Sequence, residues 1–340
     1  MKDSGVKSKL ILQEDYSNRI ADLKKFKPTI IARPYEEEYS LSLLDFAKGG
    51  KLEALEKIGS YKLNSSNGSK AKDKILCAGY DESKLKFLTL EGTAYFTTHS
   101  LVTMVEEEYL PVTLFTFYFY TKSEEIGKLS SFVKVTDDVA IESLRDYIID
   151  RNEFLIQWTQ PSTIMFIDGP LIGGNITGYS LKLIKKYHQK QIIPFFFVKN
   201  SDSNIIIDNA KELRKKYNSD IHWAYSILEP GYRSCIFKYT DEYNDENSKL
   251  FFYIKSLFHT SPQRIEFHPS TYLLIKDQLD DIIDFIYYLQ LVHGDKTNLQ
   301  LRPIAIAERF SREIIKLTNI YELFNNSIFT PTMNQVRFGD

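Results

Sequence analysis

The sequence predicts an α/β protein in which helices flank a mixed sheet. Short runs rich in Val, Ile, Phe and Tyr alternate with longer segments of helical periodicity, and this alternation is typical of α/β architecture. Two of the apolar runs end in an aspartate. In open α/β sheets, ligand-binding sites form at the carboxyl ends of the strands. The chain has 340 residues, 43% of them hydrophobic, with 22 Tyr and 23 Phe. It is therefore long enough to bury a sizeable aromatic core.

A helical arm is predicted at the N-terminus, over residues 1–65. From about residue 7 to residue 56 the pattern is helical and highly charged, with breaks at two prolines. Residues 64–69 are Ser, Asn and Gly, a composition that favours a linker. We therefore expect the functional domain to follow this linker, over residues 70–340.

The elements of this domain follow from periodicity and from breakers. Residues 75–80 are a short apolar run, and we expect this buried strand to end at Asp81. Two β-rich runs, at residues 85–98 and 112–120, predict a meander. The later patterns predict strands at residues 163–167, 192–198, 234–239, 250–257 and 264–267 and helices at residues 140–157, 179–191, 207–217, 273–291 and 304–317.

The bulk composition narrows the class of protein. Lys and Arg number 43 against 45 Asp and Glu, so the net charge of −2 gives no sign of a nucleic-acid-binding surface. A nuclease can nevertheless confine its cations to one groove beside an acidic metal site. Cys77 and Cys235 are too few for a disulfide framework, and no apolar stretch reaches the ~18 residues of a membrane span. We expect a cytoplasmic protein without membrane contact.

Asp81 and Asp168 are the two aspartates that follow buried-type strands. In open α/β sheets, ligand-binding sites form at the carboxyl ends of the strands. Acids from neighbouring strands make an oxygen-rich pocket there, suited to Mg²⁺ or Mn²⁺. Two such ions, about 3.5–4 Å apart, can activate water and stabilise the leaving oxygen of a phosphodiester. The alternative is that each aspartate only caps a helix or forms an Asx turn.

The order of the segments resembles the NurA family of DNA end-processing nucleases. The match runs from about residue 75 to residue 315 and includes an Asp-Gly-Pro-Leu motif that begins at Asp168. Its pieces are residues 78–83, 166–171, 197–199, 231–237, 263–267 and 302–309.

The resemblance implies a ribonuclease-H-like fold and a divalent-metal-dependent DNA nuclease that uses Mn²⁺ (or Mg²⁺). It implies single-strand endonuclease and 5′ to 3′ exonuclease activity, a homodimer, and a HerA-type hexameric ATPase as partner. The biological role would be DNA end resection or anti-phage defence, which the sequence does not separate.

The resemblance also implies the site residues. Asp81 and Asp168 become metal ligands, and Glu308 takes the position of an Asp or His on the last helix and becomes the third. A further catalytic acid belongs on the helix before the second strand, where Asp150 and Glu153 share one face and both stay open. Glu82 stands where the family has Gly, and Glu308 is one methylene longer than Asp; both changes keep a carboxylate at the site.

Three cations match basic positions of the family pattern. Lys199, Arg233 and Arg264 are expected to contact the phosphate backbone of DNA, with surface or interdomain salt bridges as the alternative. Glu266 lies two residues beyond Arg264 on the same strand face, and we expect it to pair with a neighbouring cation.

Two other functions stay open. One is a catalytically weak adaptor subunit that guides DNA for a HerA-type ATPase, although clustered carboxylates repel each other without metal and an adaptor has no physical reason to keep them. The other is a ribonuclease-H-type enzyme that acts on RNA, since fold alone does not fix the substrate.

Overall fold

The computed structural model describes most of the chain. The described residues are 13, 15–25, 38–44, 50–72, 74–105, 108–171, 177–199, 203–244, 246–258, 260–293, 300–320 and 322. No helix among them is long and apolar enough to cross a membrane.

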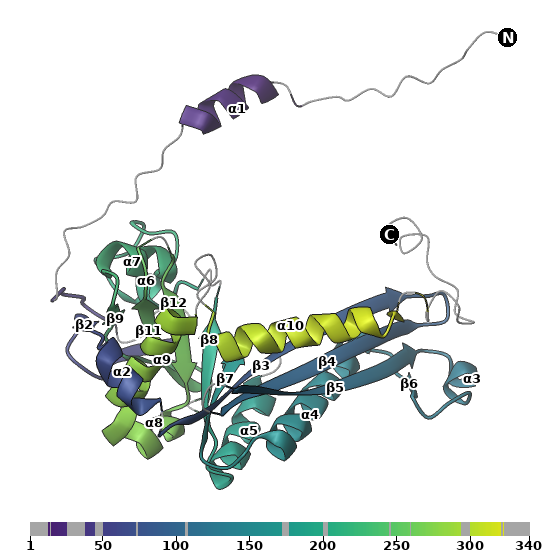
Figure 1. Ribbon diagram of the computed structural model, residues 1–340. Helices are drawn as coiled ribbons and strands as arrows, with labels where there is room; N and C mark the ends of the chain where they lie inside the picture. Colours follow the sequence, from purple (N-terminus) through teal and green to yellow (C-terminus); the bar gives the residue numbers. More distant parts are fainter. Residues whose placement is uncertain are drawn as a thin grey trace.

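The described strands form a 12-stranded mixed sheet (Figure 1) with the order β1-β10-β11-β12-β8-β7-β3-β4-β5-β6, and β2 and β9 pair beside this path. β3, β7 and β8 are parallel, as are β5 and β6, and the other pairs are antiparallel. The strands are β1 (Gly50–Ala54), β2 (Ser60–Lys62), β3 (Leu76–Leu88), β4 (Thr93–Val105), β5 (Glu108–Thr121), β6 (Val133–Val135), β7 (Thr163–Asp168), β8 (Ile193–Val198), β9 (Tyr232–Ser234), β10 (Phe237–Asp241), β11 (Ser248–Lys255) and β12 (Gln263–Phe267).

Helices cover both faces of this sheet. In Figure 1, α10 crosses one face of β3 and β4, while α4 and α5 lie against the opposite face. The helices are α1 (Tyr16–Lys25), α2 (Ser65–Ala71), α3 (Glu124–Gly127), α4 (Val139–Trp158), α5 (Thr177–Gln189), α6 (Ile205–Asn209), α7 (Asp220–Ile227), α8 (Pro269–Ile275), the 3-10 helix η2 (Lys276–Gln278), α9 (Leu279–His293) and α10 (Arg302–Leu317).

The close approach of α10 to the sheet depends on Gly79 of β3. A Cβ at this residue would lie 2.3 Å from the carbonyl carbon of Pro303 and 2.4 Å from the amide nitrogen of Ile304. Because real Cβ atoms do not come so close to backbone, only glycine lets the start of α10 rest directly on β3.

The predicted domain boundary at residue 65 cuts through the sheet, because β1 and β2 precede it and belong to the same sheet. Residues 50–54, predicted as part of a helix, form β1, because buried Leu52 pairs with Tyr239 of β10 and packs into the core. The segment predicted as a linker contains α2, whose N-terminus is capped by the side chain of Asn64. Ser and Asn favour both linkers and helix caps, and only packing decides between them. In this segment the amide of Asn64 donates to Asp284 of α9 at 2.8 Å.

Two other predicted elements are wrong in part. The helix predicted at residues 207–217 is only the short α6, and α7 was not predicted. The strand expected to end at Asp81 continues to Leu88, because residues 81–88 go on pairing with β4. β7 pairs with β3 only as far as Tyr80, so one edge of β3 has no strand partner beyond this point in the described part of the chain.

A buried histidine between the sheet and α4 makes stability depend on pH. His99 is fully buried, its Nδ1 lies 2.8 Å from the hydroxyl of Tyr80, and it stacks beside the ring of Tyr147. Burial, and then the positive charges of Lys84 and Arg151, lower the pKa of His99 to about 3.

We expect His99 to reduce the free energy of unfolding as the pH falls. A lowered folded-state pKa means that the unfolded chain takes up this proton first, from about pH 6.5 downward, at up to about 1.4 kcal/mol per pH unit. Urea unfolding at pH 6.5 and at pH 4.5 should therefore show a larger loss of stability in wild type than in His99→Phe. Equal losses in the two proteins would contradict the assignment of this proton to His99.

Candidate active site

Asp81 and Asp168 lie next to each other on neighbouring parallel strands. In the pairing of β3 with β7, Tyr80 is opposite Ile167, so the next residue of each strand is one of the two aspartates. Asp81 shares its strand face with Gly79 and therefore faces α10. The two aspartates stand side by side where β7 ends and β3 continues. β7 ends at Asp168, so the prediction that Asp168 ends a strand is confirmed.

Burial and neighbouring negative charges both raise the pKa values of the two aspartates. Burial, and after it the charge of Asp168, raises the pKa of Asp81 to about 7. Burial also raises the pKa of Asp168, and the charges of Glu82 and Glu308 add to this effect, while Lys199 opposes it. A further cation would relieve this repulsion.

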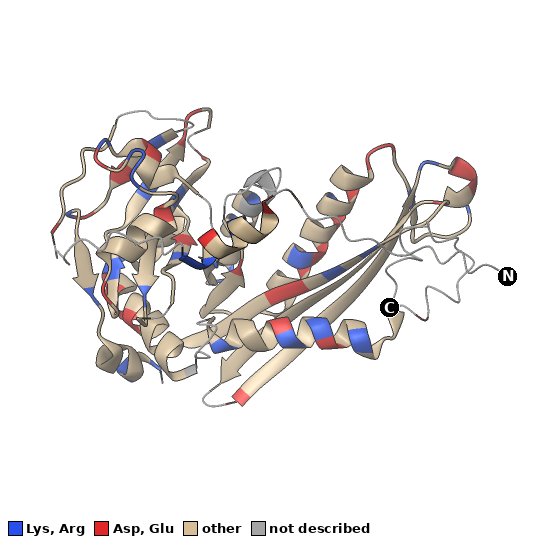
Figure 2. Cartoon of the chain, turned by 90° about the horizontal axis from the view of Figure 1, so that it is seen from above, with Lys and Arg blue, Asp and Glu red and all other residues tan. Residues whose placement is uncertain are grey.

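Lys199 joins the strand-borne acids to α10. Its Nζ lies 2.7 Å from Oδ2 of Asp168 and 3.5 Å from Oε2 of Glu308. The other carboxylate oxygen of Glu308 pairs with Arg312, one turn further along α10. Both acidic and basic residues lie along this helix (Figure 2). The structure therefore brings together four predicted residues, of which Asp81, Asp168 and Glu308 are acids and Lys199 is a cation.

The turn after Asp168 is fixed by backbone contacts. Gly169 has a φ of +103°, a conformation that glycine adopts without strain. Its amide donates to the carbonyl of Phe197 at 2.9 Å, and the amide of Leu171 donates to Oε2 of Glu266, also at 2.9 Å. Both contacts hold the backbone that carries Asp168 against β8 and β12.

Glu266 belongs to a buried charge cluster, as predicted. Its Oε1 lies 2.7 Å from Nζ of Lys249 and 2.9 Å from Nε of Arg264. Burial opposes the charged form, but these two cations hold the pKa of Glu266 below its ordinary value. Arg264 is only 4% exposed, so the expectation that it contacts DNA is not met, and its ion pair is buried instead of lying at a surface or domain boundary.

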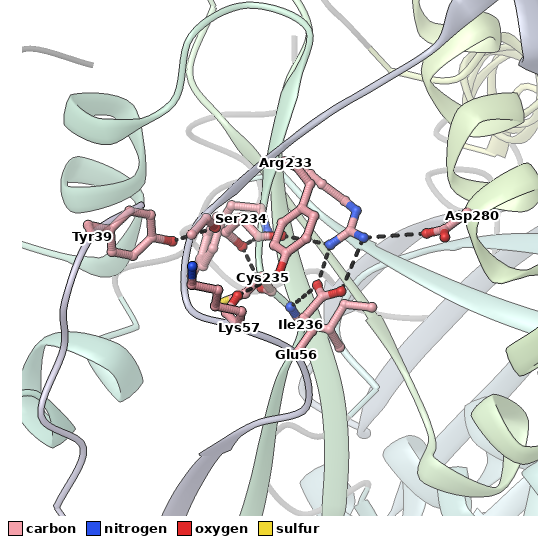
Figure 3. A network of polar contacts seen from close by, with 11 residues as sticks. Tyr39, Glu56, Lys57, Arg233, Ser234, Cys235, Ile236 and Asp280 are labelled. Carbon is pink, nitrogen blue, oxygen red and sulfur yellow. Dashed lines mark hydrogen bonds and ion pairs between the residues drawn. The ribbon is translucent and has the colours of Figure 1, made fainter. Parts of the chain in front are cut away.

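Arg233 is also buried and is not available to DNA. Figure 3 shows its guanidinium between two acids: Nη1 pairs with Glu56, and Nη2 lies 3.4 Å from Oδ1 of Asp280. Nη1 also donates to the carbonyl of Ser234 at 3.0 Å. The expectation of a phosphate contact is therefore wrong, because Glu56 already neutralises Arg233. This network ties the segment before β2 to β9 and to the start of α9.

The structure does not place Asp150 or Glu153 with the other acids. Both are on α4, which packs on the face of the sheet opposite α10. Oδ1 of Asp150 accepts a hydrogen bond from the hydroxyl of Tyr118 at 3.0 Å, and Glu153 is exposed. The expectation that one of them completes the site is not met. The helical period predicted their shared face correctly but gave no information on which side of the sheet that face would pack.

Glu82 is a further acid beside the site, and the sequence did not single it out as a ligand. It follows Asp81 directly in β3, points toward α4, and accepts a hydrogen bond from the hydroxyl of Tyr147. Its charge raises the pKa of both Asp81 and Asp168. The signal in the sequence was two adjacent acids at the end of a buried run, which we interpreted as the end of a strand.

The donor atoms fit a hard divalent cation. Asp81, Asp168 and Glu308 offer carboxylate oxygens, the ligands that Mg²⁺ and Mn²⁺ prefer. The described residues contain no group of three or more acidic, His or Cys side chains already arranged around a single ion position. Asp81 and Asp168 are the pair that would hold an ion, and Glu308 stands behind Lys199.

A mixed sheet flanked by helices, with acids from two adjacent parallel strands and from the C-terminal helix on one face, defines a ribonuclease-H-like α/β protein. A family model of the NurA domain matches residues 57–312. The chain therefore belongs to the NurA domain family.

Solved structures resemble the chain at low sequence identity. The NurA nuclease from Sulfolobus solfataricus has a TM-score of 0.50 at 10% identity, over 81% of this chain and 89% of that chain. An endonuclease V from Bacillus subtilis has a TM-score of 0.38 at 8% identity, over 74% and 90% of the two chains. No sequence among the curated proteins matches the chain.

Proposed function

We propose that this protein is a divalent-metal-dependent DNA nuclease. The observation that supports this most is the position of Asp81 and Asp168, side by side at the end of β7 and facing α10. Membership of the NurA domain family and a fold like that of the Sulfolobus NurA nuclease agree with it.

In this mechanism Asp81 and Asp168 would hold Mn²⁺ or Mg²⁺ next to the scissile phosphate. The ion would neutralise phosphate charge and lower the pKa of an attacking water. Lys199 is a compact point charge that stabilises the negative charge on the leaving oxygen of the phosphodiester. Glu308 orients the attacking water and accepts a hydrogen bond from it.

The wider role that we propose follows the family. The protein would act as a single-strand endonuclease and 5′ to 3′ exonuclease, as a homodimer, with a HerA-type hexameric ATPase that feeds it DNA. End resection and anti-phage defence are both compatible with such a pair.

One observation favours a catalytically weak adaptor as the second candidate. The ammonium of Lys199 lies between Asp168 and Glu308, so part of the acidic charge is balanced without a metal. In an adaptor, this ion-pair cluster would serve only to attach α10 to the sheet.

Metal dependence separates the two functions. We expect the purified full chain to cut end-labelled single-stranded DNA in Mn²⁺ or Mg²⁺ and to leave it intact in EDTA. Double-stranded DNA and single-stranded RNA of the same sequence test the substrate class. Failure to cut any of them in either metal, with and without a cognate ATPase, would favour the adaptor.

A further inference from the structure

Lys199 occupies a fixed place within the acid cluster. Phe197 of β8 is the partner of Asp168 of β7, and Lys199 lies two residues further along on the same face. The carbonyl of Phe197 accepts the amide of Gly169 at 2.9 Å, which ties the end of β8 to the turn after Asp168. The backbone of β8 therefore places Lys199 close to these acids.

The ammonium already binds one oxygen of each of two acids. It lies 2.7 Å from Oδ2 of Asp168 and 3.5 Å from Oε2 of Glu308. An ion shared by these two carboxylates would need metal–oxygen distances of about 2.0–2.2 Å and so could not enter while the ammonium is there. Among the described residues none donates a hydrogen bond to Oδ1 of Asp168, the oxygen left for an ion shared with Asp81.

The charge at this face agrees with one divalent ion. Asp81, Asp168 and Glu308 together carry three negative charges when ionised, and Lys199 carries one positive charge. The remaining two negative charges equal the charge of one Mn²⁺ or Mg²⁺. Arg312 contacts Glu308 only from the solvent side, where its side chain is 65% exposed and strongly screened.

We propose that Lys199 takes the place of a second metal ion, so that the site binds one divalent cation per chain, held by Asp81 and Asp168. The inference rests on the proposed nuclease function and deepens it. In two-metal sites the second ion stabilises the leaving oxygen of the phosphodiester. Here the ammonium of Lys199 supplies that positive charge, with Glu308 holding it in position.

The number of bound ions tests this directly. Metal-stripped full-length protein is titrated with Mn²⁺ at pH 7.5, without DNA, and free Mn²⁺ is measured by electron paramagnetic resonance. We expect one ion per chain in wild type and two in Lys199→Met, which keeps the length of the side chain but not its charge. Lys199→Met combined with Glu308→Gln should return to one ion. Lys211→Met, at an exposed lysine outside the site, is the matched control and should bind as wild type does.

The outcomes separate this inference from the proposed function. Two ions in wild type, or one ion in Lys199→Met, would overturn the role of Lys199 and leave the nuclease proposal standing. No bound ion in any protein would count against the metal-dependent nuclease itself. A cleavage assay adds a second readout: activity of Lys199→Met should fall roughly a hundredfold at low Mn²⁺, typical for loss of one charge-stabilising group, and recover partly at high Mn²⁺. Thermal melting of each variant checks that it is folded.

Discussion

Replacing Asp168 by asparagine is expected to reduce DNA cleavage by roughly a thousandfold or more, about 4 kcal/mol in activation free energy. Asparagine keeps the size of the side chain but removes the charge that would bind the metal and hold Lys199. The loss should appear in kcat with both Mn²⁺ and Mg²⁺, measured on end-labelled single-stranded DNA. Asp81→Asn is expected to behave in the same way.

A matched control and a second measurement make this prediction specific. Asp137→Asn, at an exposed aspartate outside the site, should cut DNA as wild type does. Because the pKa of Asp81 is raised in the folded protein, its ionised form lowers stability as the pH rises from about 4 to about 7. In EDTA at pH 8, Asp81→Asn should therefore melt no lower than wild type. An active Asp168→Asn protein would refute the site.

Glu266→Gln is expected to lower the free energy of unfolding by about 3–5 kcal/mol, because it leaves two buried cations without their acid. Lys249 and Arg264 are 3% and 4% exposed, so water cannot replace the lost charge. The variant keeps an oxygen that can accept the amide of Leu171, and the loss therefore reports on charge. Urea unfolding at pH 7 measures it.

An exposed ion pair provides the comparison for this loss. Glu313 pairs with Lys316 on α10 at 3.1 Å, with side chains 47% and 71% exposed. Glu313→Gln should change stability by less than about 1 kcal/mol, since screened surface pairs contribute little. Equal losses in free energy of unfolding for the two glutamate variants would contradict the prediction that the buried cluster contributes more to stability than a surface ion pair.

Sequence patterns predicted the parts of the site that depend on local order. The apolar run before Asp168, followed by glycine and proline, specifies a buried strand and a sharp turn within a few residues, and the structure has both. The periodicity of residues 140–157 and 304–317 likewise predicted α4 and α10 to within a few residues at each end. The NurA resemblance adds Glu308, which no periodicity would have distinguished from other acids on its helix.

The wrong predictions at the site concerned contacts between distant segments. Arg233 and Arg264 were expected to reach DNA, yet each is neutralised in the interior, Arg233 by Glu56 and Arg264 by Glu266. A cation has the same local pattern whether its partner is a phosphate or a buried carboxylate. Asp150 failed for a related reason, because the side of the sheet on which α4 packs is not written in the spacing of its own residues.

The sequence by itself determined the α/β class, most of the strands and helices, and the strand-end position of Asp168, because these depend on neighbours within a few residues. Only the tertiary structure decided that Asp81 stands inside a continuing strand, beside Asp168 and facing α10, with Lys199 between Asp168 and Glu308. Those positions depend on the pairing of β3 with β7, which joins Tyr80 to Ile167, 87 positions away, and on the contact of Gly79 with Pro303 of α10. Such contacts are fixed by the packing of the whole chain, so no local pattern specifies them.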